Sequence, residues 1–169
     1  RREMFVSAPD QVMVLRLTAS KSKQISFEAR LDRPERFETT GDGNNGLLMT
    51  GQLDAGLGGG GVRYVARIRV LNRGGQVSVR GNVLSVSNAN EVVLLIAAGT
   101  DYQGFAGRKT KDPLAATMDD LNQAAKKSYP ALRKAHIADY QKYFDRVSLS
   151  LKPANAEAAA KPATTTAST

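Results

Sequence analysis

The sequence predicts a mainly β fold, an antiparallel β-sandwich followed by a helical segment, and three observations support this prediction. Roughly eight short alternating or apolar segments succeed one another between residues 3 and 99, separated by turns that contain Gly, Asn or Pro. No stretch with helical periodicity lies between these segments, which disfavours a parallel α/β arrangement. Apolar residues at helical spacing begin only after Asp112.

The first half of the sandwich contains four predicted strands. Residues 3–8 and 11–18 are joined by the turn residues Ala8-Pro9-Asp10. Residues 24–31 alternate strictly, because Ile25, Phe27, Ala29 and Leu31 point to one side and Ser26, Glu28 and Arg30 to the other. Residues 33–40 are polar and lead into the turn sequence 41–46, so we predict no strand there. A short strand follows at 47–53.

The second half begins with the clearest alternation in the chain. Over residues 62–70, Val62, Tyr64, Ala66, Ile68 and Val70 share one face, and the opposite face carries Arg63, Val65, Arg67 and Arg69. Short strands are predicted at 76–80 and 83–86. Residues 91–99 are continuously apolar, which predicts a central strand buried on both faces.

Two helices are predicted after the strands. Asp112 is suited to be the N-cap of the first helix and Pro113 its first residue, with Leu114, Met118, Leu121 and Ala125 at helical spacing. The second begins near 128–130 and carries Leu132, His136, Ile137, Tyr140 and Phe144 on one face.

The predicted organisation of the chain therefore has four parts. Residues 1–110 form a partial β-sandwich and residues 111–146 a helical linker. Residues 147–151 alternate and predict a short strand. Residues 152–169 are rich in Ala, Thr and Pro, which is typical of a linker or a disordered tail.

Composition excludes several classes of site and of protein. The 169 residues include no Cys and one His, which excludes a disulfide framework, a thiolate zinc site, a thiol nucleophile and a multi-histidine metal site within this chain. The longest apolar run, 92–98, is far shorter than the roughly 20 residues that cross a bilayer, so we expect no membrane partner. The chain opens on Arg1 without Met or an apolar leader, and we expect an upstream part to be missing.

The formal charge of +8 raises the question of nucleic-acid binding. Arg63, Arg67 and Arg69 share one strand face, but Tyr64 lies on the opposite face, so the interleaved aromatics that stack on single-stranded bases are absent. A solvated sheet face, or one covered by another domain through Arg–carboxylate pairs, is the preferred interpretation. We therefore expect no nucleic-acid partner and keep a basic nucleic-acid-binding β domain as an alternative.

The candidate sites all have simpler interpretations. Residues 56–61 match GxGxxG, but a strand follows where a phosphate site needs a helix N-terminus. Residues 42–46 weakly resemble a calcium loop, whose twelfth position would be Leu53 instead of a carboxylate.

The titratable residues give no better candidate. His136 and Asp139 are close enough on a helix to form a His–Asp pair, but no nucleophile is evident, so a packed structural histidine is preferred. Asp119 and Asp120 diverge on their helix, and Glu91 and Asp101 lie at opposite ends of one strand. We predict no catalytic, cofactor-binding or metal-binding residue in this chain, and no cofactor.

Several segments, in order, resemble glycoside hydrolase family 95, the α-L-fucosidase and α-L-galactosidase group. Residues 2–12 are similar to the family pattern RExFxSxPDQV, residues 24–32 to the strand with ISFxAxLD, and residues 62–70, preceded by Gly61, to the strand with GVRYxARxRV. Residues 91–102 resemble the strand with VxLLxAAxTxY, Asp112-Pro113 the start of the helix that follows, and residues 136–149 HxxDYQxxFxRVxL. The resemblance covers residues 1–151 and identifies the chain with the N-terminal domain of that family.

The resemblance implies a fold and an activity. Such enzymes have an N-terminal super-sandwich, a helical linker, an (α/α)6-barrel catalytic domain and a C-terminal β-domain. They hydrolyse α-linked fucose with inversion, using a Glu acid and a water oriented by Asn and Asp residues of the barrel. No residue of this chain corresponds to those catalytic residues. The chain starts inside the family's sandwich, so the sandwich is expected to be incomplete at its N-terminus.

The expected function is therefore a non-catalytic domain that packs on, and shapes, a barrel lying outside this chain. The partners would be that barrel or a second chain that completes the fold, with a fucosylated glycan as the substrate of the whole enzyme. The resemblance also implies a secreted or periplasmic location. A free carbohydrate-binding sandwich is the alternative, although the chain has no Trp and few exposed aromatics are expected.

Overall fold

A computed structural model of the chain describes residues 1–56, 58–104 and 108–149. The strands come first and the helices last, as predicted. The elements formed by these residues are β1 (Arg2–Ser7), β2 (Val12–Thr18), β3 (Ile25–Ala29), β4 (Phe37–Gly41), β5 (Gly46–Asp54), β6 (Gly60–Arg73), β7 (Gln76–Arg80), β8 (Val83–Ala89), β9 (Glu91–Thr100), α1 (Pro113–Ala125) and α2 (Tyr129–Phe144).

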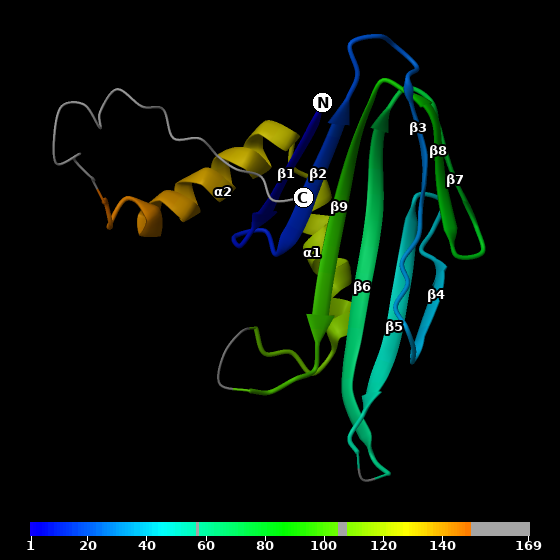
Figure 1. Cartoon of the computed structure of the whole chain (residues 1–169), viewed down its shortest axis with the longest axis vertical. Coiled ribbons are helices and arrows are strands. Elements are labelled where there is room, and N and C mark those ends of the chain that lie inside the picture. Colours follow the sequence, from blue (N-terminus) through cyan, green and yellow to red (C-terminus); the bar gives the residue numbers. More distant parts are fainter. Residues whose placement is uncertain (57, 105–107, 150–169) are drawn as a thin grey trace, which may run out of the picture.

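The strands form two antiparallel sheets that face each other (Figure 1). The large sheet has the order β1-β2-β9-β6-β5-β4, and the small sheet has the order β3-β8-β7. All pairings between neighbouring strands are antiparallel. The predicted fold class, a mainly β antiparallel sandwich followed by helices, is confirmed.

The apolar residues divide into two cores, one on each side of the large sheet. The core between the two sheets contains Leu47, Ile68 and Val70 of the large sheet together with Leu84 and Val86 of the small one. The second core lies between the large sheet and the helices. Its buried residues are Val12, Val14, Val93, Leu95, Ala97, Leu121, Ala124 and Leu132.

Strand β9 contributes to both cores, as its unbroken apolar sequence predicted. Val92 and Leu94 face the small sheet, whereas Val93 and Leu95 face the helices. A strand between two covered faces must carry apolar residues at consecutive positions, because both sets of side chains leave water.

Helix α1 covers the face of the large sheet opposite the small sheet (Figure 1). The Asp112 carboxylate caps it by accepting a hydrogen bond from the Ala115 amide at 3.0 Å, and Pro113 is its first residue. Ser128 caps α2 in the same way through the Ala131 amide at 3.4 Å. Both predicted helix starts are confirmed, and α1 is an integral layer of the fold.

Two predictions for individual segments are wrong. The polar segment 33–40 contains the edge strand β4, in which Phe37 and Thr39 are half-buried and alternate with exposed residues. Edge strands bury only part of one face, so their apolar pattern is weak. Residues 147–149 form neither helix nor strand, although a strand was predicted over 147–151. Residues 150 and 151 and the predicted tail at 152–169 lie outside the described residues.

Within the part of the chain that the structure describes, neither helix is long and apolar enough to cross a membrane.

Candidate interaction surface

The arginine face of β6 lies under α1. Arg67 is almost completely buried, and its guanidinium donates to the Asp42 carboxylate at 2.6 Å and to the Thr117 hydroxyl at 3.2 Å. Arg69 donates to the Asn122 side chain at 2.9 Å. The structure thus gives these two side chains partners within the chain, and Arg67 is not available to phosphates.

Asp42 therefore has a structural role in the turn that faintly resembled a calcium loop. The turn joins β4 to β5, and the Asn45 amide group donates to the Val70 carbonyl at 2.9 Å. The Asp42 backbone also donates to the Gly46 carbonyl at 2.9 Å. No cluster of three or more potential metal ligands occurs among residues 1–56, 58–104 and 108–149.

The other carboxylates singled out in the sequence are also paired with arginines. Glu91 accepts from Arg16 at 2.6 Å and lies 3.3 Å from Arg73, and Asp101 accepts from Arg63 at 2.7 Å. The hydrogen bond from Arg16 holds the pKa of Glu91 below its ordinary value, and Arg63 does the same to the pKa of Asp101. A carboxyl group that acts as a general acid at neutral pH needs a raised pKa, whereas the pKa values of Glu91 and Asp101 are lowered.

Replacing Glu91 by glutamine is expected to remove an acid-sensitive part of the stability. Because the pKa of Glu91 is lowered on folding, its ion pair stabilises the chain above the ordinary value of 4.5 and is lost as the pH falls through the lower folded value. Urea unfolding at a series of pH values between 7 and 3 measures this: E91Q should be less stable than the wild type at pH 7, and the gap should narrow as the pH falls below 4.5. E28Q, which alters an exposed ion pair with Arg30, is the control. A gap that stays the same across the series would contradict the assignment.

His136 has the packing role that the sequence favoured. Its ring stacks on Phe5 of β1 with centroids 5.0 Å apart and lies 6.2 Å from the ring of Tyr140. The neighbouring Asp139 accepts from Lys142 at 3.3 Å. A His–Asp proton relay is not formed.

The glycine-rich segment lies at the hairpin between β5 and β6. Gly56 and Gly58 both have positive φ angles, of 83° and 77°, which favour glycine. The chain continues directly into β6 without a helix, and Leu57 lies outside the described residues. The phosphate-binding interpretation of the motif therefore has no helix N-terminus to support it.

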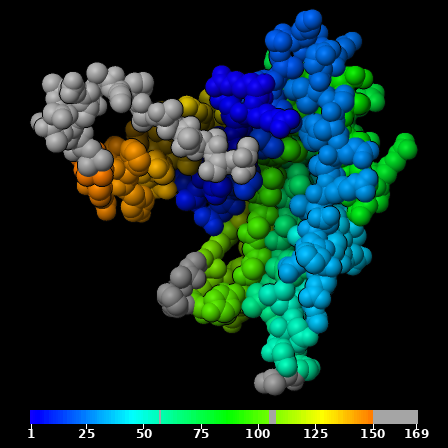
Figure 2. All heavy atoms as spheres, viewed as in Figure 1, coloured from blue at the N-terminus to red at the C-terminus, as the bar shows by residue number. Residues whose placement is uncertain are grey.

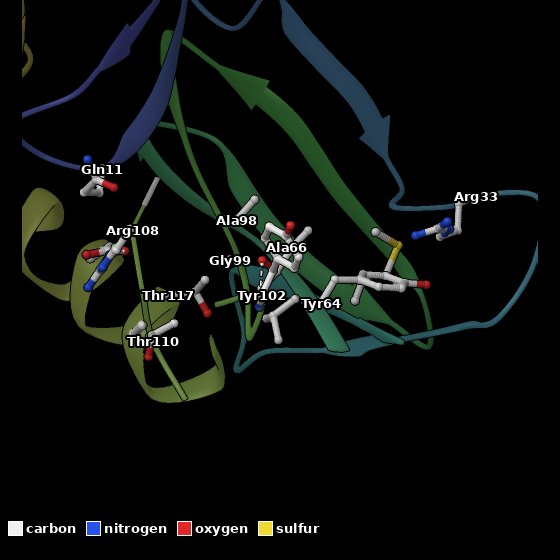
Figure 3. Close-up of a pocket in the computed structure, with 15 residues that line it drawn as sticks. Gln11, Arg33, Tyr64, Ala66, Ala98, Gly99, Tyr102, Arg108, Thr110 and Thr117 are labelled. Carbon is white, nitrogen blue, oxygen red and sulfur yellow. Dashed lines mark hydrogen bonds and ion pairs between the residues drawn. The ribbon is translucent and has the colours of Figure 1, made fainter. Parts of the chain in front are cut away.

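A hollow of about 520 Å³ lies where β9 ends and α1 begins (Figure 3). Several of its polar lining residues already have partners. Arg108 pairs with Asp120, the Arg33 guanidinium lies 4.3 Å from the Tyr64 ring centroid, and the Tyr64 hydroxyl donates to the carbonyl of Arg36, outside the lining, at 2.6 Å. Asp120 is the one carboxylate among the described lining residues and is paired with Arg108, so the hollow holds no two carboxyl groups for general acid–base catalysis.

The two ends of α2 differ in how far their apolar side chains are buried. Its first half is held on the large sheet by the buried Leu132 and by Tyr129, which packs on Phe5 and lies under the Arg16 guanidinium at 4.6 Å. Its second half points away from both sheets (Figure 1). There Tyr143 is 66% exposed and Phe144 62% exposed.

We call the exposed end of this helix the α2 aromatic ridge, formed by Tyr140, Tyr143 and Phe144. The rings of Tyr140 and Phe144 stack at 5.2 Å, and the exposed apolar residues Val147 and Leu149 follow in the chain. Clustered exposed aromatics of this kind mark a surface that contacts another protein element. The ridge is the strongest candidate for a functional surface in this chain.

The helical spacing of the sequence places Tyr140 and Phe144 on the same helix face as Leu132 and His136. The large sheet covers only the first half of that face, because β1, whose Phe5 stacks on His136, is the edge strand of the sheet. Periodicity identified the apolar face correctly. It carried no information on how far the sheet extends beneath it.

Comparisons with known proteins agree with this architecture. The profile of the family described as "Glycosyl hydrolase family 65, N-terminal domain" matches residues 1–105. Alpha-L-fucosidase 2 of Arabidopsis thaliana is 31% identical over 189 residues, which include 98% of this chain and 22% of the plant protein. Probable alpha-fucosidase A of Aspergillus niger is 30% identical over 169 residues, which include 93% of this chain and 21% of the fungal protein.

The chain spans about a fifth of the length of these two relatives. The matched profile describes family 65, whereas the sequence motifs resembled family 95. Both findings agree that the chain is an N-terminal domain of a glycoside hydrolase. The profile covers all nine strands that the structure describes and ends before α1. The chain belongs to the family of glycosyl hydrolase family 65 N-terminal domains.

Proposed function

We propose that this chain is the non-catalytic N-terminal β-sandwich, with its helical segment, of an inverting α-L-fucosidase of glycoside hydrolase family 95. The catalytic residues would lie in an (α/α)6-barrel outside these 169 residues, and the substrate of the whole enzyme would be a fucosylated glycan. Two relatives with alpha-fucosidase names and the ordered family 95 motifs support the proposal. The same resemblance supports a secreted or periplasmic location.

The α2 aromatic ridge is the observation that carries the proposed role. A helix that is anchored at one end by Leu132 and exposes three aromatic side chains at the other is suited to bridge two domains. Burial of large aromatic side chains dominates the energetics of such contacts. We infer that the ridge packs against the barrel and so fixes the sandwich relative to it.

The carboxylates support the non-catalytic part of the proposal. Asp42, Glu91, Asp101 and Asp120 each form an ion pair with an arginine. None of these pairs leaves two facing carboxyl groups free to act on the two sides of a glycosidic bond.

Hydrolysis of an aryl α-L-fucoside tests the proposal. The complete polypeptide that carries this domain should release the aryl alcohol, and the 169-residue chain alone should give only the background rate. Calorimetry of the same chain with fucosylated oligosaccharides should give no binding in the micromolar range. Turnover by the isolated chain would contradict the proposal, and micromolar binding would favour a carbohydrate-binding module instead.

A further inference from the structure

A groove of about 680 Å³ lies between the large sheet and helix α2. We call it the β1–α2 groove, and the charged residues that line it are Arg1, Glu3, Arg16, Arg133 and Lys134. The start of α2 forms one wall and the strands β1 and β2 form the other. Figure 2 shows the orange end of α2 projecting beyond the dark blue atoms of β1.

The carboxylates near the groove are already used by arginines of the sheet. Glu3 accepts a hydrogen bond from Arg1 at 2.8 Å and lies 3.5 Å from Arg16. Arg16 also donates to Glu91 at 2.6 Å, and Glu91 lies 3.3 Å from Arg73. Two carboxylates therefore serve three arginines, and neither is left to neutralise a further cation.

Helix α2 adds two cations to the groove. Arg133 and Lys134 are exposed, and within residues 1–56, 58–104 and 108–149 they form no ion pair. The first turn of α2 holds no acidic residue, so the positive end of the helix dipole adds to their potential. Surplus positive charge inside a groove attracts an anionic ligand.

The uncharged lining residues fit a sugar better than a nucleic-acid base or a peptide anchor. The Gln141 amide and the Tyr129 hydroxyl can bond to the hydroxyl groups of a glycan. The Tyr129 ring already packs on Phe5 and beneath the Arg16 guanidinium, which leaves little of it for a base to stack on. Ile137 is the one large aliphatic side chain among the described lining residues, so a peptide finds little to anchor on.

We propose that the β1–α2 groove binds the sulfate or carboxylate group of an acidic glycan, with Arg133 and Lys134 as the main contacts. A guanidinium suits such oxyanions, because it donates two parallel hydrogen bonds to them. The choice of a glycan as the source of the anion rests on the proposed function, in which the whole enzyme acts on a glycan. The surplus charge of the groove does not depend on it.

Calorimetry of the complete polypeptide with model polysaccharides tests the proposal. The probes are dextran sulfate, which carries sulfate groups, polygalacturonate, which carries carboxylates, and neutral dextran. At least one acidic polysaccharide should bind, dextran should not, and the tighter of the two acidic probes identifies the acid group. Measurements at about 0.15 M salt largely screen charges more than about 8 Å away, so the affinity reports on nearby cations.

Two double variants locate the binding in the groove. R133Q/K134Q should bind the acidic polysaccharide at least about tenfold more weakly than the wild type. R80Q/K111Q removes the same charge from exposed residues outside the groove, one on β7 and one before α1, and should bind within about twofold of the wild type.

A third variant should strengthen binding, which a misfolded protein cannot do. E3Q removes the carboxylate that pairs with Arg1 and Arg16, so both guanidinium groups gain donors for the ligand. We expect E3Q to bind the acidic polysaccharide several-fold more tightly than the wild type. Unchanged or weaker binding by E3Q would mean that these arginines do not face the ligand, and the proposal would fail.

Other results would also overturn the proposal. Equal losses in R133Q/K134Q and R80Q/K111Q would mean that binding follows net charge alone. Equal binding of dextran and dextran sulfate, or no binding of either acidic polysaccharide, would exclude an anion site. Tighter binding of poly-L-glutamate or single-stranded DNA would make the ligand an acidic protein or a nucleic acid. Hydrolysis of the aryl α-L-fucoside is measured separately, so failure of the proposed function leaves this result readable.

Discussion

Replacing Arg67 by alanine is expected to lower the free energy of unfolding by about 3 kcal/mol, the lower end of what removing one partner of a buried ion pair costs. The guanidinium is buried between α1 and the β4–β5 turn and donates to both Asp42 and Thr117. Without it the mostly buried Asp42 carboxylate loses its countercharge and Thr117 loses a donor. Urea unfolding of the 169-residue chain followed by circular dichroism gives the difference directly.

Arg63→Ala is the matched control on the same strand face. Its guanidinium pairs with Asp101, but its side chain is 58% exposed, and exposed pairs contribute about 0–1 kcal/mol. If R67A and R63A lower the free energy of unfolding equally, the buried contact of Arg67 with Asp42 and Thr117 stabilises the chain no more than the exposed pair of Arg63 with Asp101. The pairing of the basic strand face with α1 would then be wrong.

Replacing Leu121 by alanine should cost about 2–5 kcal/mol, the range for truncating a fully buried leucine. Leu121 has no exposed surface and packs against the β2 and β9 side chains of the second core. The truncation removes apolar burial and leaves a cavity between α1 and the large sheet. Thermal unfolding monitored in the far ultraviolet should show the lower stability as a lower Tm.

Leu114→Ala, on the same helix, controls for the loss of a leucine from α1. Leu114 is 43% exposed, so we expect a cost of less than about 1 kcal/mol. A Leu121→Ala protein that unfolds like the Leu114→Ala protein would mean that α1 is a loosely attached linker. In that case the second core would not hold the helix on the sheet.

The strands that the sequence predicted well are those whose burial is complete or strictly alternating. The consecutive apolar residues of β9 predicted a strand covered on both faces, and β9 lies between two cores. Strand β4 was missed because an edge strand with Phe37 and Thr39 half-buried presents too few apolar residues to distinguish it from a turn. The pattern of apolar residues in a segment depends on how many of its side chains are buried, and an edge strand buries few of them.

The interaction surface was harder to predict than the fold. The arginines of β6 were expected to face solvent or another domain, whereas Arg67 and Arg69 bind Thr117 and Asn122 of α1. These contacts join residues about 50 positions apart, and no local spacing reveals them. The α2 aromatic ridge was visible as an apolar helix face, but its exposure depends on where the large sheet ends.

Hydrogen exchange of α2 in the complete polypeptide and in the 169-residue chain tests most directly whether this domain docks through its ridge. We predict that the amides around Tyr140, Tyr143 and Phe144 exchange slowly in the complete polypeptide and rapidly in the chain alone. Amides of α1, which the large sheet covers in either form, should be protected in both and supply the internal control. Equally rapid exchange of the ridge amides in both proteins would contradict the account, because it would leave α2 without a partner domain.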